Sequence, residues 1–436
     1  MKTPIFDFVK EYAKRDAMRL HMPGHKGASL LGCESIDITE IHGADSLYEA
    51  DGIIRESEAN ASGLFGCNTF YSTEGSSQCI RAMLLLALKQ AKANGKKPLI
   101  MAGRNAHKVF LTAAALLDFE IEWLCSKSYL SCDISAKAIE EAIKRCSPAA
   151  LYITSPDYLG NISDIGEIAK VCKKYGVLLL VDNAHGAYLR FLEKSLHPID
   201  LGADMCCDSA HKTLPALTGA AYLHIKDDEI ARNAKNALAL FGSTSPSYLT
   251  LQSLDLVNKY IADGYKEKLS SFTCDLASLK DTLEKNGYTL QGNEPLKITI
   301  DAKAYGYSGY DLLAELEKVN IVCEFADPDF TVLMLTPENK SLKEIESAML
   351  SIKKRGAIDI PMPSFYECKR IMSVREAVFA KSENVSIENA LGRTISEPCV
   401  GCPPAVPIVM CGEQIDKSAI ECFKYYGIKT CQVIKD

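Results

Sequence analysis

The chain has 436 residues and a formal net charge of −7 at pH 7, and 47% of its residues are hydrophobic. This is the composition of a globular protein large enough for several domains. Because the chain is acidic and has no basic run, we expect no nucleic-acid partner, and no apolar run is long enough to predict a membrane span.

The 17 cysteines predict a reducing compartment rather than a set of disulfides. Residues 1–4 lead into an amphipathic segment instead of an apolar signal sequence, and Cys206 and Cys207 lie in an apolar run. We therefore expect reduced thiols and a cytoplasmic protein. Cys399 and Cys402 form one C-x-x-C pair. A structural zinc site usually has a second such pair, so we interpret these cysteines as loop and core thiols and assign no metal.

In chain order, residues 1–60 show no regular strand–helix alternation and are expected to form an arm with functional loops. From residue 61 to 255, short apolar runs alternate with helical patterns. The strands expected there are 98–102, 149–154, 177–181 and 220–225. Continuous apolar strands alternating with helices are typical of a mostly parallel sheet covered on both faces. The predicted fold class is therefore α/β, with ligands bound beyond the carboxyl ends of the strands.

The pattern changes after a long helical stretch at about 248–286. Residues 256–360 are expected to form a small α+β domain, with strands at 296–300, 320–325 and 330–335. Pro361–Pro363 marks a linker, and residues 361–436 are expected to form a short C-terminal domain with a helix near 374–381. The predicted domains are thus 1–60, 61–255, 256–360 and 361–436.

The first candidate site element is the turn Ser72–Ser77, which precedes a helical run at 78–92. A small, hydroxyl-rich turn that opens a helix offers backbone N–H groups and the positive end of the helix dipole to a phosphate. Taken alone, the turn is better explained as an ordinary helix cap. The chain has neither a Walker pattern nor a dinucleotide glycine fingerprint, which disfavours a nucleotide ligand.

The most informative pair is Asp182 and Lys212. Asp182 ends an apolar run, and Lys212 follows another inside the segment Ser209–Leu214. This layout suits pyridoxal phosphate, since a lysine amine forms the Schiff base and a buried carboxylate keeps the ring nitrogen protonated. Ala184 is small enough for a flat ring to lie against it. Two alternatives stay open: Asp182 as a loop cap, and His185 as a buried structural histidine.

Histidines gather in the same kind of motif. Of the eight in the chain, four lie in polar segments rich in small residues: His25, His107, His185 and His211. His107 follows an apolar strand and should lie at the carboxyl edge of the sheet, where an imidazole could stack on a cofactor ring. A surface-loop histidine is the alternative.

Together these motifs resemble, in order and over nearly the whole chain, those of the Orn/Lys/Arg decarboxylase family, which are fold type I pyridoxal-phosphate enzymes. The resemblance is to the short form of the family, without the additional N-terminal domain of longer members. The matching segments are Met22–Gly27, Gly43–Leu47, Thr73–Ser77, Arg104–Lys108, Ser155–Tyr158, Asp182–Ala187, Ser209–Leu217, Ser243–Tyr248, Ala390–Arg393, Cys402–Pro407 and Gly412–Glu413.

The resemblance implies a set of site residues. Lys212 would bond to the cofactor aldehyde, Asp182 would pair with the ring nitrogen, and His107 and Ala184 would lie against the two ring faces. His185 would also belong to the cofactor site. The phosphate would be held by Gly75, Ser76, Ser77, Ser209 and His211, and by Thr244, or its neighbour Ser243, of a second subunit. The site would then lie at the interface of a homodimer or a larger homo-oligomer.

The implied reaction is decarboxylation of arginine, lysine or ornithine to the corresponding amine, in polyamine-related metabolism. The substrate would be contacted by His25 and Lys26 of the arm and by Glu413, with Asp157 and Glu74 as further acidic candidates. Asn183 stands where an acidic residue is expected, and this departure leaves the choice of basic amino acid open. The alternatives are a fold type I aminotransferase, another pyridoxal-phosphate lyase, or a homologue that binds the cofactor with little catalysis.

Overall fold

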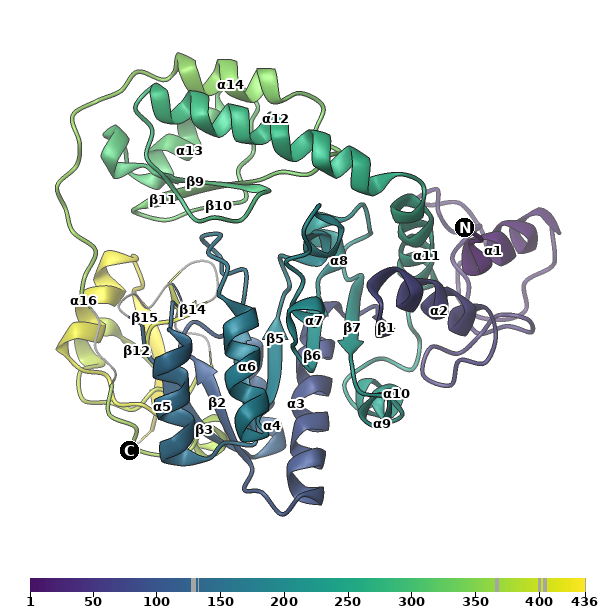
Figure 1. The fold of residues 1–436 in the computed structure, drawn as a ribbon, viewed down its shortest axis with the longest axis horizontal. Coiled ribbons are helices and arrows are strands. Elements are labelled where there is room, and N and C mark those ends of the chain that lie inside the picture. Colours follow the sequence, from purple (N-terminus) through teal and green to yellow (C-terminus); the bar gives the residue numbers. More distant parts are fainter. Residues whose placement is uncertain (127–130, 132, 365–367, 399–400, 403–405, 436) are drawn as a thin grey trace. The chain divides into compact units, whose positions relative to one another are not determined.

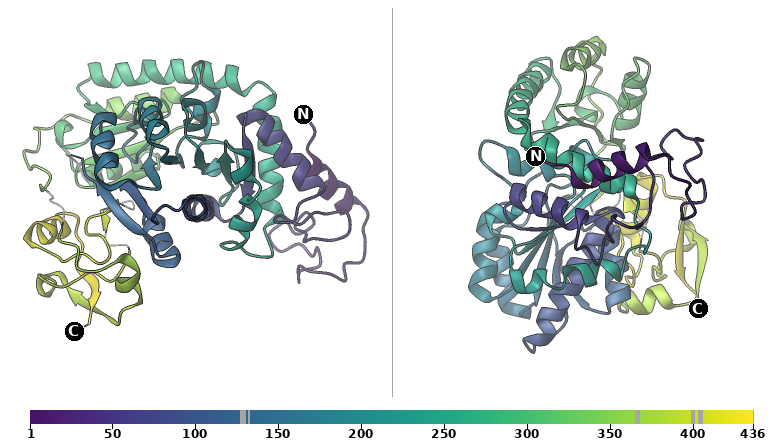
Figure 2. Two further views of the ribbon diagram at one scale, coloured as in Figure 1. Left: turned by 60° about the horizontal axis from the view of Figure 1, so that its bottom comes forward. Right: turned by 90° about the vertical axis from the view of Figure 1, so that its right-hand side faces the viewer.

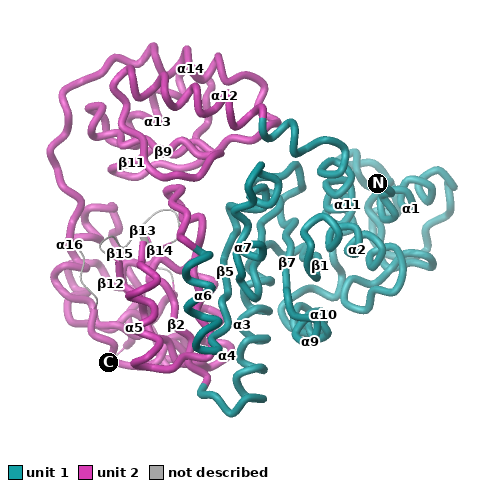
Figure 3. Tube along the Cα trace, in the orientation of Figure 1, with its two compact units in different colours: residues 1–97, 165–270 teal, residues 98–164, 271–436 magenta. Residues whose placement is uncertain are grey.

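The computed structural model describes residues 1–126, 131, 133–364, 368–398, 401–402 and 406–435. Figure 3 shows its two compact units, one of residues 1–97 and 165–270 and the other of residues 98–164 and 271–436. The expected domain boundaries near residues 60, 255 and 360 stay predictions. No helix in the described part of the chain is both long and apolar enough to cross a membrane.

In the first unit, four strands lie side by side in the order β1 (Asn68–Ser72), β7 (Ala221–Ile225), β6 (Met205–Asp208) and β5 (Leu178–Asp182) (Figure 1). β5 and β6 are parallel, whereas β7 is antiparallel to both β6 and β1. Consequently β1, β5 and β6 run in the same direction and end at the same edge. The expected strands at 177–181 and 220–225 are confirmed, and β1 and β6 were not predicted.

Helix α3 (Gly75–Ala93) packs on these strands through an apolar stripe that includes Ile80, Met83, Leu84 and Ala87. This spacing is that of one face of a helix. The other helices of the sheet region are α6 (Ile165–Tyr175), η1 (Ala187–Phe191), α7 (Pro198–Leu201), α8 (Ala210–Thr213), α9 (Asp228–Ala231) and α10 (Ala234–Ala239).

Three further helices of the first unit meet at Asp255: α1 (Pro4–Lys14), α2 (Ile53–Phe65) and α11 (Tyr248–Ala262) (Figures 1 and 2). The Asp255 carboxylate on α11 accepts hydrogen bonds from the backbone N–H groups of Ile5 and Phe6, at 2.9 and 3.0 Å, and from the Ser57 hydroxyl at 2.6 Å. It thereby caps α1, whose own N-cap residue makes no side-chain hydrogen bond. Burial raises the pKa of Asp255 to about 6, although these donors lower it.

We predict that this carboxylate makes stability depend on pH. Its pKa in the folded protein lies above its ordinary value of about 3.9, so the protonated form is favoured in the folded state. Its contribution should therefore make the free energy of unfolding fall as the pH rises from about 4 through about 6, and Asp255→Asn should show a smaller loss. Urea denaturation of both proteins across this range measures the difference. Asp263→Asn, at an exposed position just after α11, is the control and should follow the wild type.

The second unit contains β4 (Ala150–Thr154), β2 (Leu99–Gly103) and β3 (Glu120–Leu124), side by side in that order. β2 is parallel to both neighbours. Helices α4 (Lys108–Leu117) and α5 (Ala136–Cys146) belong to the same unit. The strands expected at 98–102 and 149–154 are confirmed, and β3 was not predicted.

The small antiparallel sheet has the order β10 (Phe325–Ala326), β11 (Phe330–Met334), β9 (Lys297–Asp301) and β8 (Leu290–Gln291). Its helical elements are η2 (Lys303–Tyr305), α13 (Gly309–Glu317) and α14 (Leu342–Ser351). The strand expected at 320–325 was wrong except at its end, because Asn320 takes φ +61° and Val322 is 85% exposed. The helix expected at 248–286 is two helices, α11 and α12 (Tyr265–Lys285), separated at Gly264 with φ +98°.

The C-terminal part of the second unit pairs β12 (Ser382–Ser386) with β15 (Thr430–Ile434), and β13 (Gly401–Cys402) with β14 (Val406–Pro407). Its helices are α15 (Val374–Phe379), η3 (Ile387–Asn389) and α16 (Lys417–Tyr425). One apolar core joins this part to the small sheet, with Ile395, Ile408 and Phe423 buried together with Phe330 and Val332.

Candidate active site

The site of the first unit forms where β1, β5 and β6 end. The turn that contains Gly75 follows β1, Asp182 is the last residue of β5, and Ser209 follows β6 directly. The register confirms that these ends meet, since Asp182 pairs with Cys207 and Asp208 pairs with Tyr222 of β7. Parallel strands bring residues far apart in sequence to one sheet edge, and ligands of α/β sheets bind there.

The first turn of α3 is built to receive an anion. Glu74 at the N-cap makes no side-chain capping hydrogen bond, so the helix dipole and first-turn N–H groups have no side-chain cap. The hydroxyls of Ser209 and Ser76 are 2.9 Å apart, which places the expected phosphate ligands of two segments together. Ser77 follows in the same turn.

Gly219 is a residue of this site that the sequence did not reveal. Its carbonyl accepts a hydrogen bond of 2.8 Å from the backbone N–H of Gly75. It has φ +93°, and a Cβ there would lie 2.8 Å from the Thr73 carbonyl oxygen, so only glycine permits this approach. In the sequence, Gly219 is marked only by its position directly before an apolar strand.

Lys212 lies in the short helix α8, and its Nζ is 3.0 Å from Nε2 of His185. The two side chains come from the segments that follow β6 and β5. Asp182 is only 3% exposed, and its carboxylate accepts from the Ala184 backbone N–H at 3.3 Å and from the Cys207 thiol at 3.7 Å. The structure therefore places Lys212, His185, Asp182 and Ala184 at one sheet edge, and their roles toward a cofactor stay predictions.

His211 takes a fixed orientation beside this group. Its Nδ1 is 2.8 Å from the Ala220 carbonyl oxygen. Nδ1 therefore carries the proton, and Nε2 takes no part in this hydrogen bond. Burial lowers the pKa of His211, the Ala220 hydrogen bond raises it and the Lys212 charge lowers it, with a net decrease. A phosphate bound at Nε2 would oppose that decrease, because an anion favours the protonated imidazole.

Other predicted residues of the first unit are less closely tied to this group. Thr244 and Ser243 are exposed in the loop between α10 and α11, and their expected contact with a second subunit stays a prediction. In the arm, Nε2 of His25 is 3.2 Å from Asp37, and exposed Lys26 donates to the His21 carbonyl. Their role toward a substrate also stays a prediction.

His107, Asp157 and Glu413 belong to the second unit. His107 follows β2 and caps α4, with its Nδ1 accepting from the Val109 N–H at 3.2 Å. Asp157 is buried and accepts from Asn161, and burial raises its pKa although these bonds lower it. The stacking of His107 on a cofactor stays a prediction.

Glu413 makes a buried bidentate ion pair with Arg104, which follows β2. The two N···O distances are 2.8 and 2.7 Å, and the side chains are 2% and 5% exposed. The Glu413 carboxylate also accepts from the Met410 N–H at 2.9 Å. This carboxylate is thus engaged by protein groups of its own unit, which favours a structural role over a contact with a basic substrate. Cys399 and Pro403–Ala405 of the neighbouring motif lie outside the described residues.

Comparison with known proteins assigns the chain to a family. The model of the Orn/Lys/Arg decarboxylase major domain matches residues 3–299, and the model of the C-terminal domain of the same enzymes matches residues 366–432. The chain belongs to the Orn/Lys/Arg decarboxylase family. It is a pyridoxal-phosphate-dependent decarboxylase with the fold type I architecture.

Individual relatives match this chain over nearly its full length. The chain is 30% identical to the uncharacterized protein YaaO of Bacillus subtilis, over 97% of this chain and 93% of YaaO. It is 29% identical to an arginine decarboxylase of Halalkalibacterium halodurans, over 96% and 92%. The lysine decarboxylase LdcF of Francisella novicida has the same fold, with a TM-score of 0.79 at 15% identity, over 99% of this chain and 81% of LdcF.

The residues of the first unit fit the cofactor of the family. The turn of α3, with the hydroxyls of Ser76 and Ser209, suits a phosphate, and the amine of Lys212 lies at the same sheet edge, beside His185. The buried carboxylate of Asp182 suits a protonated ring nitrogen, because a buried anion is stabilised by a cationic partner.

In this decarboxylase, we predict that Glu413→Gln lowers the free energy of unfolding by about 3–5 kcal/mol, because it leaves the Arg104 charge buried without its counter-charge. Urea denaturation measures the change. The matched control is Glu122→Gln, which removes the partner of exposed Arg145 and should cost less than about 1 kcal/mol. A loss for Glu413→Gln as small as that of the control would contradict the structural role of the pair.

Proposed function

We propose that this chain removes the α-carboxylate of a basic amino acid, with arginine as the substrate, and so supplies an amine to polyamine-related metabolism. The observation that carries the proposal is the meeting of Lys212, His185 and Asp182 at one sheet edge beside an uncapped helix N-terminus. Arginine is chosen over lysine and ornithine because the H. halodurans relative, matched over nearly full length, is named an arginine decarboxylase.

Bound pyridoxal phosphate supplies an electron sink for the pair of electrons that breaking the Cα–carboxylate bond leaves behind. The residues of the chain hold the cofactor and orient the substrate. Asp182 would hold a proton on the ring nitrogen, and the α3 turn with Ser76 and Ser209 would anchor the phosphate. Orienting the substrate so that its carboxylate leaves is a positioning effect, and positioning of this kind contributes several kcal/mol to catalysis.

The hydrogen bond between Lys212 and His185 gives the site a means to move a proton. Lysine can only donate when charged, so His185 Nε2 accepts in that state. Once the Lys212 amine becomes neutral it can accept a proton from His185 in return. The pair can therefore hold the proton that returns to the substrate α-carbon.

We place this reaction in the cytoplasm and in a homodimer or larger homo-oligomer. None of the cysteines whose side chains the structure describes is in a disulfide, which fits a reducing compartment. The exposed loop with Ser243 and Thr244 supports an active site completed by a second subunit, since its hydroxyls are accessible to a partner.

Lys212→Ala should abolish decarboxylation and remove the visible absorbance of lysine-bound pyridoxal phosphate, because alanine has no amine that can bond to the cofactor aldehyde. Spectrophotometry and CO₂ release on the variant test this. Lys226→Ala, at an exposed lysine after β7, is the matched control and should keep both signals. Turnover by Lys212→Ala equal to that of the wild type would refute the assignment.

The substrate is tested by comparing arginine, lysine and ornithine side by side, with pyridoxal phosphate supplied and both CO₂ and amine measured. We expect kcat/KM to be highest for arginine. A preference for lysine or ornithine would overturn the choice of substrate but leave the reaction type intact. Formation of a keto acid in place of CO₂ would indicate an aminotransferase.

A further inference from the structure

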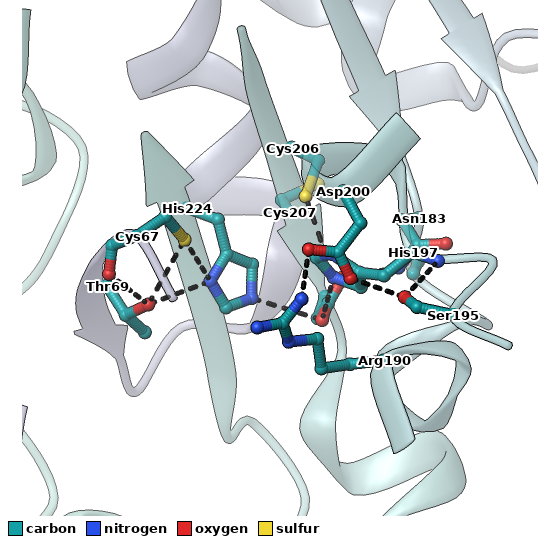
Figure 4. Close-up of polar contacts among 12 residues, drawn as sticks. Cys67, Thr69, Asn183, Arg190, Ser195, His197, Asp200, Cys206, Cys207 and His224 are labelled. Atoms are coloured by element: carbon teal, nitrogen blue, oxygen red, sulfur yellow. Dashed lines mark hydrogen bonds and ion pairs between the residues drawn. The ribbon is translucent and has the colours of Figure 1, made fainter. Parts of the chain in front are cut away.

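A second group of chemically active side chains lies in the core of the first unit, apart from the residues assigned to the cofactor. It consists of His197 at the N-cap of α7, Cys206 and Asp208 on β6, and His224 on β7. All four are 0% exposed. One ligand atom from each side chain lies within 4.8 Å of the others. Figure 4 shows His197, Cys206 and His224 turned toward one another.

We propose that His197, Cys206, Asp208 and His224 form a structural binding site for one divalent transition-metal ion of the zinc class. No metal is expected from the sequence, where only the spacing of cysteines was informative. The proposal does not depend on the decarboxylation reaction or on its substrate.

The distances are close to those that a tetrahedral centre needs. Nε2 of His197 and Nε2 of His224 are each 3.1 Å from Oδ2 of Asp208, and Sγ of Cys206 is 3.8 Å from Nε2 of His197. Zinc bond lengths place neighbouring N and O ligands about 3.4 Å apart, and neighbouring N and S ligands about 3.6 Å apart. These three distances differ from the expected ones by a few tenths of an ångström, and all four ligand atoms lie within 4.8 Å of one another.

The charge and chemistry of the donors also match. Two neutral imidazoles, one thiolate and one carboxylate are ligands that zinc accepts, and four protein ligands with full burial are typical of closed structural sites. The thiolate and the carboxylate together neutralise a divalent ion. A metal would also place a full positive charge beside the buried Asp208 carboxylate, which favours the ionised form of that group.

Outer contacts orient two of the ligands. Asn183 Nδ2 donates to Oδ1 of Asp208 at 2.6 Å, which leaves Oδ2 facing the two histidines. Nδ1 of His224 is 2.9 Å from the Thr69 hydroxyl (Figure 4). This orientation leaves Nε2 of His224 3.1 Å from Oδ2 of Asp208. Metal ligands in proteins are held by second partners of this kind.

Strand geometry explains why these residues meet. Side chains alternate along a strand, so Cys206 and Asp208 lie on one face of β6 and Cys207, beside Asp182, lies on the other. The register then pairs Cys206 with His224, and His224 with Thr69. A metal here would tie β6, β7 and α7 together directly before the segment that carries Lys212.

The test measures metal in the full-length, pyridoxal-phosphate-loaded protein expressed with zinc, after dialysis against a chelator. Mass spectrometry should find about one Zn²⁺ per chain, released only on denaturation because the site has no exposed ligand. The variant Cys206→Ser should retain much less metal and unfold at a lower temperature. The control Cys172→Ser, at a buried thiol of α6 outside the group, should retain the full amount.

A spectroscopic readout covers the case in which a variant fails to fold. Refolding the wild type with Co²⁺ should give the absorption bands of tetrahedral cobalt and a thiolate charge-transfer band that Cys206→Ser lacks. Lys212→Ala should still bind the metal, which separates this site from the reaction. Wild-type protein that holds no metal and shows no cobalt bands would overturn the proposal and leave these side chains joined by hydrogen bonds alone.

Discussion

The active site depends on one constraint: β1, β5 and β6 run in the same direction and end at the same edge. In sequence, η1, α7 and β6 separate Asp182 from the Ser209–Lys212 segment, yet its strand pairs directly with β6. The phosphate turn reaches this edge only because β7 is antiparallel to both of its neighbours, which returns β1 to the direction of β5 and β6. A one-residue shift of β6 would turn Cys207 away from Asp182 and reverse the two faces of the strand.

The same strand serves two environments. One face of β6 carries Cys207 against the carboxylate assigned to the cofactor ring, and the other carries Cys206 and Asp208 into a dry polar cluster. Asn183 connects the two environments, because it follows Asp182 directly while its side chain donates to Asp208. This explains physically why an amide at position 183 suits the chain: it donates to the buried carboxylate, which an acidic side chain would repel.

The sequence predicts the elements that have a strong local signal and fails where the signal is tertiary. Strands β2, β4, β5 and β7 have apolar patterns of the right length, and they are confirmed. β6 is missed because it is only four residues long, and β3 because two glutamates interrupt its apolar pattern. Lys212 and Asp182 could be paired from spacing and chemistry, whereas the role of Gly219 depends on its contact with the turn after β1, which no local pattern reports.

Glu413 shows the same limit for charged residues. A carboxylate in a conspicuous motif is a reasonable candidate for binding a basic substrate, and only the fold reveals that Arg104, far away in sequence, already neutralises it. Two opposite charges that are both almost fully buried are stable only as a pair, since desolvating either alone costs several kcal/mol. A cation that took Arg104's place at Glu413 would leave the Arg104 charge buried without its partner, and this cost argues for a structural role of the pair.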